Sequence, residues 1–113
     1  MPRHSLKSRK MIQALFQSGK RFRSGNLTVY RDSEPAKIRG GYLAAYIISS
    51  EAGCAVERNR IKRWLRVDFR KQQELGRLEG TFLIRFRGIA AETSHERLRG
   101  ELDKTCKSIR IDG

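Results

Sequence analysis

Residues 57–66, which read Glu-Arg-Asn-Arg-Ile-Lys-Arg-Trp-Leu-Arg, are the most informative stretch of this chain. The run continues to Lys71 without glycine or proline and therefore predicts one helix of about four turns. At about 100° per residue, one apolar stripe forms from Ile61, Trp64, Leu65 and Phe69. The opposite face carries Asn59, Arg63, Arg66 and Arg70, flanked by Arg60 and Lys62. The pattern predicts a helix that packs on a scaffold through one side and presents cations on the other.

The cations of this helix have few partners of opposite sign in the same segment. Its acids are Glu57 and Asp68, so i,i+4 pairing cannot neutralise the helix. Most of the cations are arginines, whose planar guanidinium group binds phosphate through paired hydrogen bonds and stacks on bases. A solvated charged face is the ordinary alternative for a basic helix. The excess of arginine favours contact with a polyanion.

Length and composition set further bounds. The 113 residues predict one domain over 1–113 with a modest core. Lys and Arg number 25 against 12 Asp and Glu, and the formal net charge of +13 points to nucleic acid or an anionic membrane surface. Neither a membrane-spanning run of roughly 20 apolar residues nor a secretory signal is recognisable. Cys54 and Cys106 match no metal-ligand spacing, and a reduced, cytoplasmic location without a disulfide is the simplest inference.

The remaining chain predicts two further helices and three strands. Residues 1–7 are basic, polar and expected to be flexible. Helices are expected at 9–18 and after the Ser94 cap, where the core stripe is Leu98, Leu102, Cys106 and Ile109. Strands are expected at 27–30, 41–48 and 81–86, of which 41–48 is apolar on both faces and should be buried. Segment 20–26 is interpreted as a basic approach segment and 32–40 as a turn. The order α-β-β-α-β-α predicts an α+β fold, a small two-layer sandwich of helices on a sheet.

Residues 52–63, Ala-Gly-Cys-Ala-Val-Glu-Arg-Asn-Arg-Ile-Lys-Arg, resemble the signature of the bacterial ribonuclease P protein subunit. That signature is a glycine, an Ala-Val pair and then Arg-Asn-Arg-Ile-Lys-Arg. The similarity extends over most of the chain, through residues 14–21, 27–30 and 87–94. The resemblance implies a left-handed β-α-β crossover, where the residue pattern alone would favour a right-handed one.

The resemblance also implies a function. In the family, an RNA subunit with bound Mg²⁺ hydrolyses the phosphodiester that joins the 5′ leader to precursor tRNA. The protein is a non-catalytic subunit of this ribonucleoprotein endonuclease, so no catalytic residue, protein metal site or organic cofactor is expected in the chain. Its expected partners are the ribonuclease P RNA subunit and precursor tRNA, with no membrane.

Two sets of site residues follow from the resemblance. The face toward the RNA subunit is assigned Arg58, Asn59, Arg60, Lys62, Arg63 and Arg66. The cleft for the leader, between the N-terminal helix and the sheet, is assigned Phe16, Tyr30 and Arg21. Aromatic rings suit single-stranded RNA, because stacking contributes about 1–3 kcal/mol per base with any sequence. Departures from the family pattern are Ile12 for a second Phe, Ser50-Glu51 for a pair of lysines, and Cys54 for a polar or basic residue.

Other candidate sites have simpler interpretations. His4 and His95 are isolated, and His95 is expected to begin a helix. The acids Glu92, Glu96 and Asp103 are interpreted as surface pairs rather than metal ligands. Trp64 is assigned to the core in preference to a role in base stacking, and Phe22 is either a stacking residue or a strand anchor.

Three competing functions share the basic composition. A structural, ribosomal-type RNA-binding protein would have the same size and charge without any role in hydrolysis. A DNA-binding regulator would use residues 58–71 as a recognition helix, but a buried strand rather than a helix precedes them. A peripheral membrane protein would need an exposed apolar face, whereas the stripe of this helix is committed to the core.

Overall fold

A computed structural model describes residues 9–32, 42–76, 78 and 80–112 of the chain. Its helices are α1 (Arg9–Ser18), α2 (Ala55–Glu74) and α3 (His95–Asp112), and its strands are β1 (Lys20–Ser24), β2 (Leu27–Arg31), β3 (Tyr42–Ile48) and β4 (Gly80–Phe86). Short 3₁₀ turns, η2 (Ser50–Ala52) and η3 (Ala90–Glu92), precede α2 and α3. The expected flexible segment 1–7, His4 and most of the expected turn at 32–40 lie outside the described residues.

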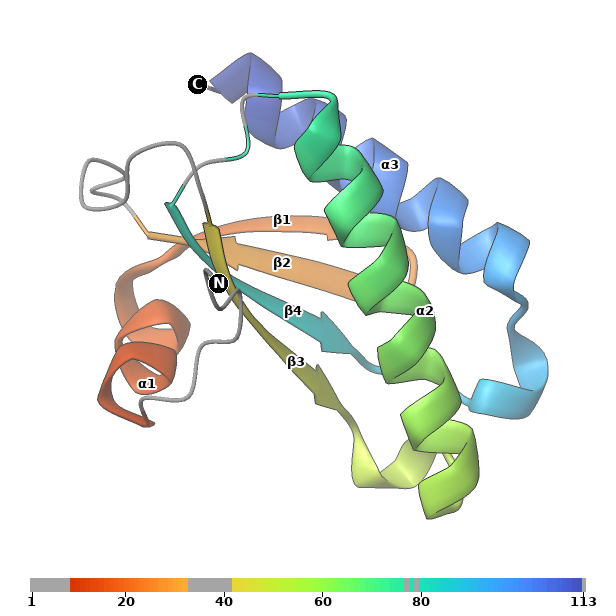
Figure 1. Cartoon of the computed structure of the whole chain (residues 1–113). Helices are drawn as coiled ribbons and strands as arrows, with labels where there is room; N and C mark the ends of the chain where they lie inside the picture. The colour runs from red at the N-terminus through yellow and green to blue at the C-terminus, as the bar shows by residue number, and fades with distance from the viewer. Residues whose placement is uncertain (1–8, 33–41, 77, 79, 113) are drawn as a thin grey trace, which may run out of the picture.

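The strands form one mixed sheet in the order β1-β2-β4-β3 (Figure 1). The β1–β2 and β2–β4 pairs are antiparallel, whereas β3 and β4 are parallel neighbours. Parallel neighbours require a crossover, and α2 supplies it between β3 and β4. The predicted α+β class and the crossover unit are confirmed, and the left hand of the crossover stays a prediction.

Segment 20–26 was not predicted as a strand, and this interpretation is wrong. It forms β1 and a tight turn at Gly25 and Asn26, where Gly25 has φ +58°. Within β1, Phe22 is half-buried against the main core, while Arg21 and Arg23 are exposed. One inward apolar residue between arginines gives too weak an alternation to predict a strand. Phe22 is therefore a strand anchor.

The expectation of a fully buried strand at 41–48 also needs correction. β3 lies at the edge of the sheet, where Ala44 and Ala45 are buried but Leu43, Tyr46, Ile47 and Ile48 are half-buried. The central strand is β4, flanked by β2 and β3. The side chains of β3 are apolar on both faces because helices pack on both sides of the sheet.

The two faces of the sheet belong to separate clusters of buried residues. The larger cluster joins Val29, Phe82, Ile84 and Phe86 of the sheet to the helices α2 and α3. The smaller one joins Tyr30, Ala45 and Leu83 to Leu15 of α1. Successive strand residues point to opposite faces, so α2 and α3 cover one face and α1 lies on the other.

The buried residues that α2 and α3 contribute to the larger cluster all belong to the predicted helix stripes. Ile61, Leu65 and Phe69 of α2 have no exposed surface, and the same holds for Leu98, Leu102, Cys106 and Ile109 of α3. Trp64 does not belong to the fully buried set: it is half-buried at the edge of the cluster. Asp68 and Gln72 are buried instead, on the side of α2 that faces α3.

We predict that Leu65→Ala lowers the free energy of unfolding by about 2–5 kcal/mol, because it leaves a cavity where α2 meets the sheet. Val67→Ala is the control on the same helix. Its side chain is 45% exposed, so the change should stay within about 0.5 kcal/mol. Urea unfolding measures both, and similar midpoints for the two variants would contradict the assigned packing of α2.

Candidate nucleic-acid interface

The N-terminus of α2 is fixed by a carboxylate of its own first turn. The backbone N–H of Cys54 donates a hydrogen bond of 3.1 Å to Oε1 of Glu57, and this bond lowers the pKa of Glu57. Gly53 precedes it with φ +154°, and a Cβ at this position would lie 2.6 Å from the same Oε1. Only glycine fits there, which explains the glycine that opens the 53–63 motif.

The second acid of α2 is directed toward α3. The side chain of Asp68 is 3% exposed, and its Oδ2 lies 2.8 Å from Nε2 of His95. Arg99 of α3 approaches Oδ1 at 3.9 Å. Glu57 and Asp68 thus have partners other than the α2 cations. Over the described ranges, no Lys or Arg of α2 forms an ion pair with a carboxylate.

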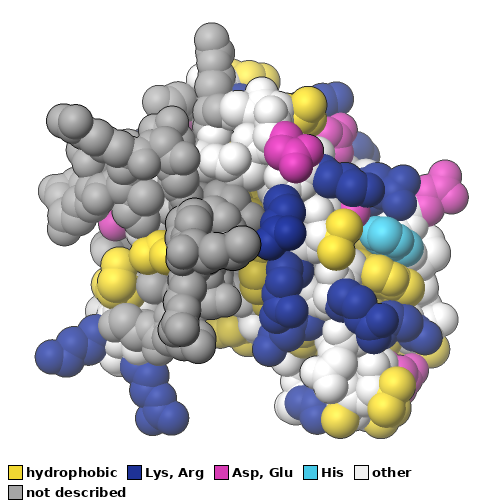
Figure 2. Space-filling model, in the orientation of Figure 1, with side chains coloured by type: hydrophobic (Ala, Val, Ile, Leu, Met, Phe, Trp, Pro, Cys, Tyr) yellow, Lys and Arg dark blue, Asp and Glu magenta, His cyan; other side chains and the backbone are white. Residues whose placement is uncertain are grey.

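The predicted RNA-subunit residues fall on the accessible surface of α2. Asn59, Arg63 and Arg66 are exposed, whereas Arg58, Arg60 and Lys62 are half-buried. Nε of Arg58, where the stem of the side chain joins the guanidinium carbon, is buried, so this side chain lies along the protein surface rather than standing free in solvent. Figure 2 shows Lys and Arg side chains gathered over the part of the molecule where α2 lies. We call Arg58, Asn59, Arg60, Lys62, Arg63, Arg66 and Arg70 the arginine face.

Part of the arginine face borders a small hollow. A recess of about 170 Å³ lies between the end of β3 and the first turns of α2, lined by Ile48, Ala55, Arg58, Asn59 and Lys62. Two other arginines lie over aromatic rings: the guanidinium carbon of Arg66 is 5.9 Å from the ring centre of Tyr46, and that of Arg60 is 5.3 Å from that of Trp64. Two guanidinium groups of the arginine face, those of Arg60 and Arg66, are therefore positioned by aromatic rings.

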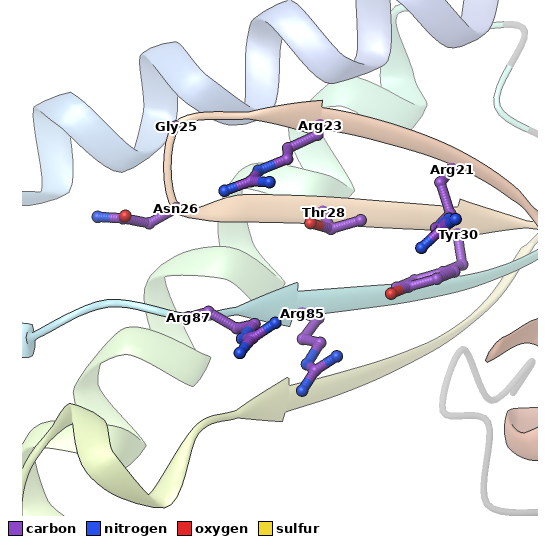
Figure 3. A pocket seen from close by; sticks show the side chains of 8 residues that line it. All are labelled: Arg21, Arg23, Gly25, Asn26, Thr28, Tyr30, Arg85 and Arg87. Carbon is purple, nitrogen blue, oxygen red and sulfur yellow. The ribbon is translucent and has the colours of Figure 1, made fainter.

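A second cationic surface is a groove of about 610 Å³. It is lined by Arg21, Arg23, Gly25, Asn26, Thr28, Tyr30, Arg85 and Arg87. These residues come from β1, β2, β4 and their ends, and they rise from the sheet face that α2 and α3 do not cover (Figure 3). We call this surface the arginine groove. It places four guanidinium groups around one recess.

Two backbone contacts shape the end of the arginine groove. The N–H of Asn26 donates to the Glu101 carboxylate of α3, at 3.3 Å to Oε2, which ties down the β1–β2 turn. The N–H of Arg87 donates to the Asn26 carbonyl at 2.9 Å. The chain leaving β4 is therefore held beside the turn, and the Arg87 side chain reaches the groove.

The predicted leader residues are brought together at this groove. Arg21 and Tyr30 line it, and Phe16 of α1 packs edge-on against Tyr30 with ring centres 5.1 Å apart. Phe16 is 38% exposed, whereas Tyr30 is 5% exposed. Little of the Tyr30 ring is accessible for stacking, and its hydroxyl points into the groove (Figure 3). Phe16 is the accessible aromatic surface.

Sequence reasoning missed Arg23, Arg85 and Arg87 as groove residues. Arg85 is the one charged residue in the otherwise apolar or small β4, and its guanidinium carbon lies 5.5 Å from the ring centre of Phe16. That interruption of the strand was an available signal. Arg23 could have been found by its two-residue spacing from Arg21 once β1 was recognised as a strand.

Among the residues that the structure describes, no group of three or more His, Cys, Asp or Glu side chains could hold a metal ion. Asp103, one of the acids considered in the sequence, accepts a hydrogen bond from Gln72 and pairs with Lys107; the Gln72 bond lowers its pKa. None of the described helices has the length and apolar character needed to cross a membrane.

The fold and its two surfaces define a small α+β protein with arginines arranged to meet anionic partners. The ribonuclease P family model matches residues 1–110, and the chain belongs to this family. The resemblance noted for residues 52–63 is thereby confirmed.

Individual relatives agree with this assignment. The ribonuclease P protein component of Halalkalibacterium halodurans is 26% identical over 96% of this chain and 89% of its own length. That of Macrococcus caseolyticus is 29% identical over 94% and 86%, respectively. The ribonuclease P protein structures of Staphylococcus aureus and Thermotoga maritima superpose with TM-scores of 0.82 and 0.72, each at 18% identity. They cover 99% and 96% of this chain and 100% and 97% of their own, and so share its fold.

The two cysteines offer a test of how α2 and α3 are placed. Cys54 is exposed, and Cys106 is fully buried. Burial raises the pKa of Cys106 to about 12, and alkylating reagents attack the thiolate. We predict that iodoacetamide labels Cys54 in the folded protein and labels Cys106 only after denaturation. Cys54→Ser should abolish native labelling, and rapid native labelling of Cys106 would contradict the position of α3.

Proposed function

We propose that the chain is the protein subunit of ribonuclease P and that its two cationic surfaces bind different RNA segments. The arginine face of α2 binds the catalytic RNA subunit. The arginine groove and Phe16 bind the 5′ leader of precursor tRNA. The chain itself hydrolyses no bond; it assists the RNA subunit, which holds the Mg²⁺ ions, in removing the leader to give the mature 5′ end. We place this activity in the cytoplasm.

The observation that carries the proposal is that, within the described part of the chain, no carboxylate forms an ion pair with a Lys or Arg of α2. Glu57 and Asp68 are engaged elsewhere, at the helix N-terminus and with α3. Arginines that are close together repel one another, and this repulsion is relieved when phosphates lie opposite. A structured RNA presents a dense surface of phosphates and is therefore a suitable partner for the arginine face. Each guanidinium group can bind a phosphate through paired hydrogen bonds.

The groove suits a single strand for a different reason. Its guanidinium groups surround a recess, and the partly exposed ring of Phe16 contacts two of the lining residues, Tyr30 and Arg85. Cations beside an aromatic ring are the usual means of binding single strands without sequence preference, because every base has a stackable face. Tolerance of sequence is what a processor of many different leaders requires.

Adding the purified chain to ribonuclease P RNA at low Mg²⁺ tests the proposal. We predict faster cleavage of precursor tRNA than with the RNA alone, because protein cations reduce phosphate repulsion between the RNA subunit and its substrate. An unchanged rate, despite RNA binding, would indicate a structural RNA-binding protein of the ribosomal type. Base-specific binding to duplex DNA at physiological salt would favour a regulator instead.

The division of labour between the two surfaces is a separate prediction. Arg63→Ala should weaken binding to the RNA subunit by about 1.5–3 kcal/mol, the typical contribution of a charge-assisted hydrogen bond. Phe16→Ala should leave that affinity unchanged and weaken binding of long-leader precursor tRNA to the assembled holoenzyme by about 1–3 kcal/mol. Leaderless tRNA is the control substrate. If both variants affect leaderless tRNA equally, the assignment of separate surfaces is wrong.

A further inference from the structure

Four side chains link the interior of the α2–α3 interface to the arginine face. They are Asp68, His95, Trp64 and Arg60, and we call them the ring stack. Residues 60, 64 and 68 are spaced by four along α2 and so lie on one side of it. His95 is the first residue of α3. The stack begins at a buried carboxylate and ends at a guanidinium group assigned to the RNA-subunit face.

The first contact of the stack fixes the imidazole. Oδ2 of Asp68 lies 2.8 Å from Nε2 of His95, and the Asp68 side chain is only 3% exposed. Since α2 and the core hold this carboxylate in place, the bond determines how the His95 ring is turned. Arg99 is the other charged group near Asp68, at 3.9 Å from Oδ1.

The next two contacts join the His95 ring to Trp64, and Trp64 to Arg60 on the surface of α2. The rings of His95 and Trp64 are parallel, with an interplanar angle of 1° and centres 5.0 Å apart. The guanidinium carbon of Arg60 lies 5.3 Å from the Trp64 ring centre. Stacked rings and cation–π contacts are both attractive, and both favour defined relative positions. No carboxylate of the described residues forms an ion pair with this guanidinium group, so its hydrogen-bond donors are available to an external anion.

From this geometry we propose that Asp68, His95 and Trp64 are positioning residues, which hold Arg60 in the orientation that binds a phosphate of the RNA subunit. The inference rests on the function proposed above. Its physical basis is preorganisation: an arginine ordered before binding loses less conformational freedom when it meets its phosphate. Arg63 on the same helix is exposed, and the described contacts do not join it to the ring stack.

A double-mutant cycle on RNA-subunit affinity tests the proposal. We expect His95→Ala to weaken binding about three- to tenfold in the otherwise unchanged protein, and to have little effect once Arg60→Ala is present. The matched control combines His95→Ala with Arg63→Ala, where the two losses should multiply to within about twofold. An equal effect of His95→Ala in the presence and absence of Arg60 would overturn the proposal.

Substitutions at Trp64 separate positioning from packing. Trp64→Phe retains a flat ring and should preserve most of the affinity, whereas Trp64→Leu retains apolar packing without a flat ring and should bind as weakly as His95→Ala. Equal affinities of these two variants would also overturn the proposal. Because they leave the Asp68–His95 pair intact, this comparison remains decisive if His95→Ala does not fold.

Fluorescence gives a readout that does not depend on RNA. Trp64 is the one tryptophan of the 113-residue chain, so its emission reports directly on the stack. His95→Ala should change this emission while circular dichroism shows an intact fold, and an unchanged emission would contradict the stacked geometry.

The binding data distinguish failure of this proposal from failure of the proposed function. If Arg60→Ala and Arg63→Ala both leave RNA-subunit affinity unaltered, the proposed function itself fails. If they weaken it but His95 does not couple to Arg60, only the ring stack proposal fails.

Discussion

The structure depends on where α2 directs its few carboxylates. Glu57 binds the backbone at the start of the helix, and Asp68 is buried against α3. Each acid thereby stabilises the fold, and neither forms an ion pair with a described cation of α2. Glu74, the third acid, is the last residue of the helix and forms no ion pair within the described residues either. The apolar stripe of Ile61, Leu65 and Phe69 must then hold α2 in place despite repulsion among its arginines. Burying three such side chains contributes about 1.5–3 kcal/mol each, whereas like-charge pairs at helical spacing cost only a few tenths. Packing therefore outweighs the repulsion, and the helix can retain an unneutralised face.

The alternation of strand residues creates the second cationic surface on the other side of the sheet. On β4, Phe82, Ile84 and Phe86 point toward α2 and α3, and Leu83 and Arg85 point the other way. Leu83 is covered by α1, whereas Arg85 lines the groove, with its guanidinium carbon 5.5 Å from the ring centre of Phe16 in α1. The arginine groove is thus the uncovered part of a sheet face. The two surfaces are backed by opposite sides of the same sheet, so an RNA bound to one need not displace an RNA bound to the other.

The sequence predicted the structure well where apolar residues repeat at helical spacing and are buried against the sheet. The stripe of α3 and its Ser94 cap were predicted, and Arg97 N–H indeed donates to the Ser94 hydroxyl at 3.1 Å. Strand β1 was missed because its outward arginines hide a single inward phenylalanine. The groove was only partly predicted, since Arg23, Arg85 and Arg87 come from separate strands or their ends and meet only through pairing of β1, β2 and β4. The half-buried position of Trp64, stacked on His95, was not predicted. The two residues lie in different helices, and the periodicity of one helix cannot reveal a contact with another.

Aromatic rings take the place of carboxylates at both cationic surfaces. Arg60 and Arg66 lie over Trp64 and Tyr46, and Arg85 lies over Phe16. A carboxylate would orient a guanidinium group more strongly, but it would cancel the charge that a phosphate needs. A ring attracts the cation through its quadrupole, which carries no net charge. The contact is worth about 0.5–1 kcal/mol at exposed sites, enough to favour one orientation and weak enough to yield when a phosphate binds. Arginines on rings are therefore ordered and still available, which is the combination that a protein binding two RNA segments would need.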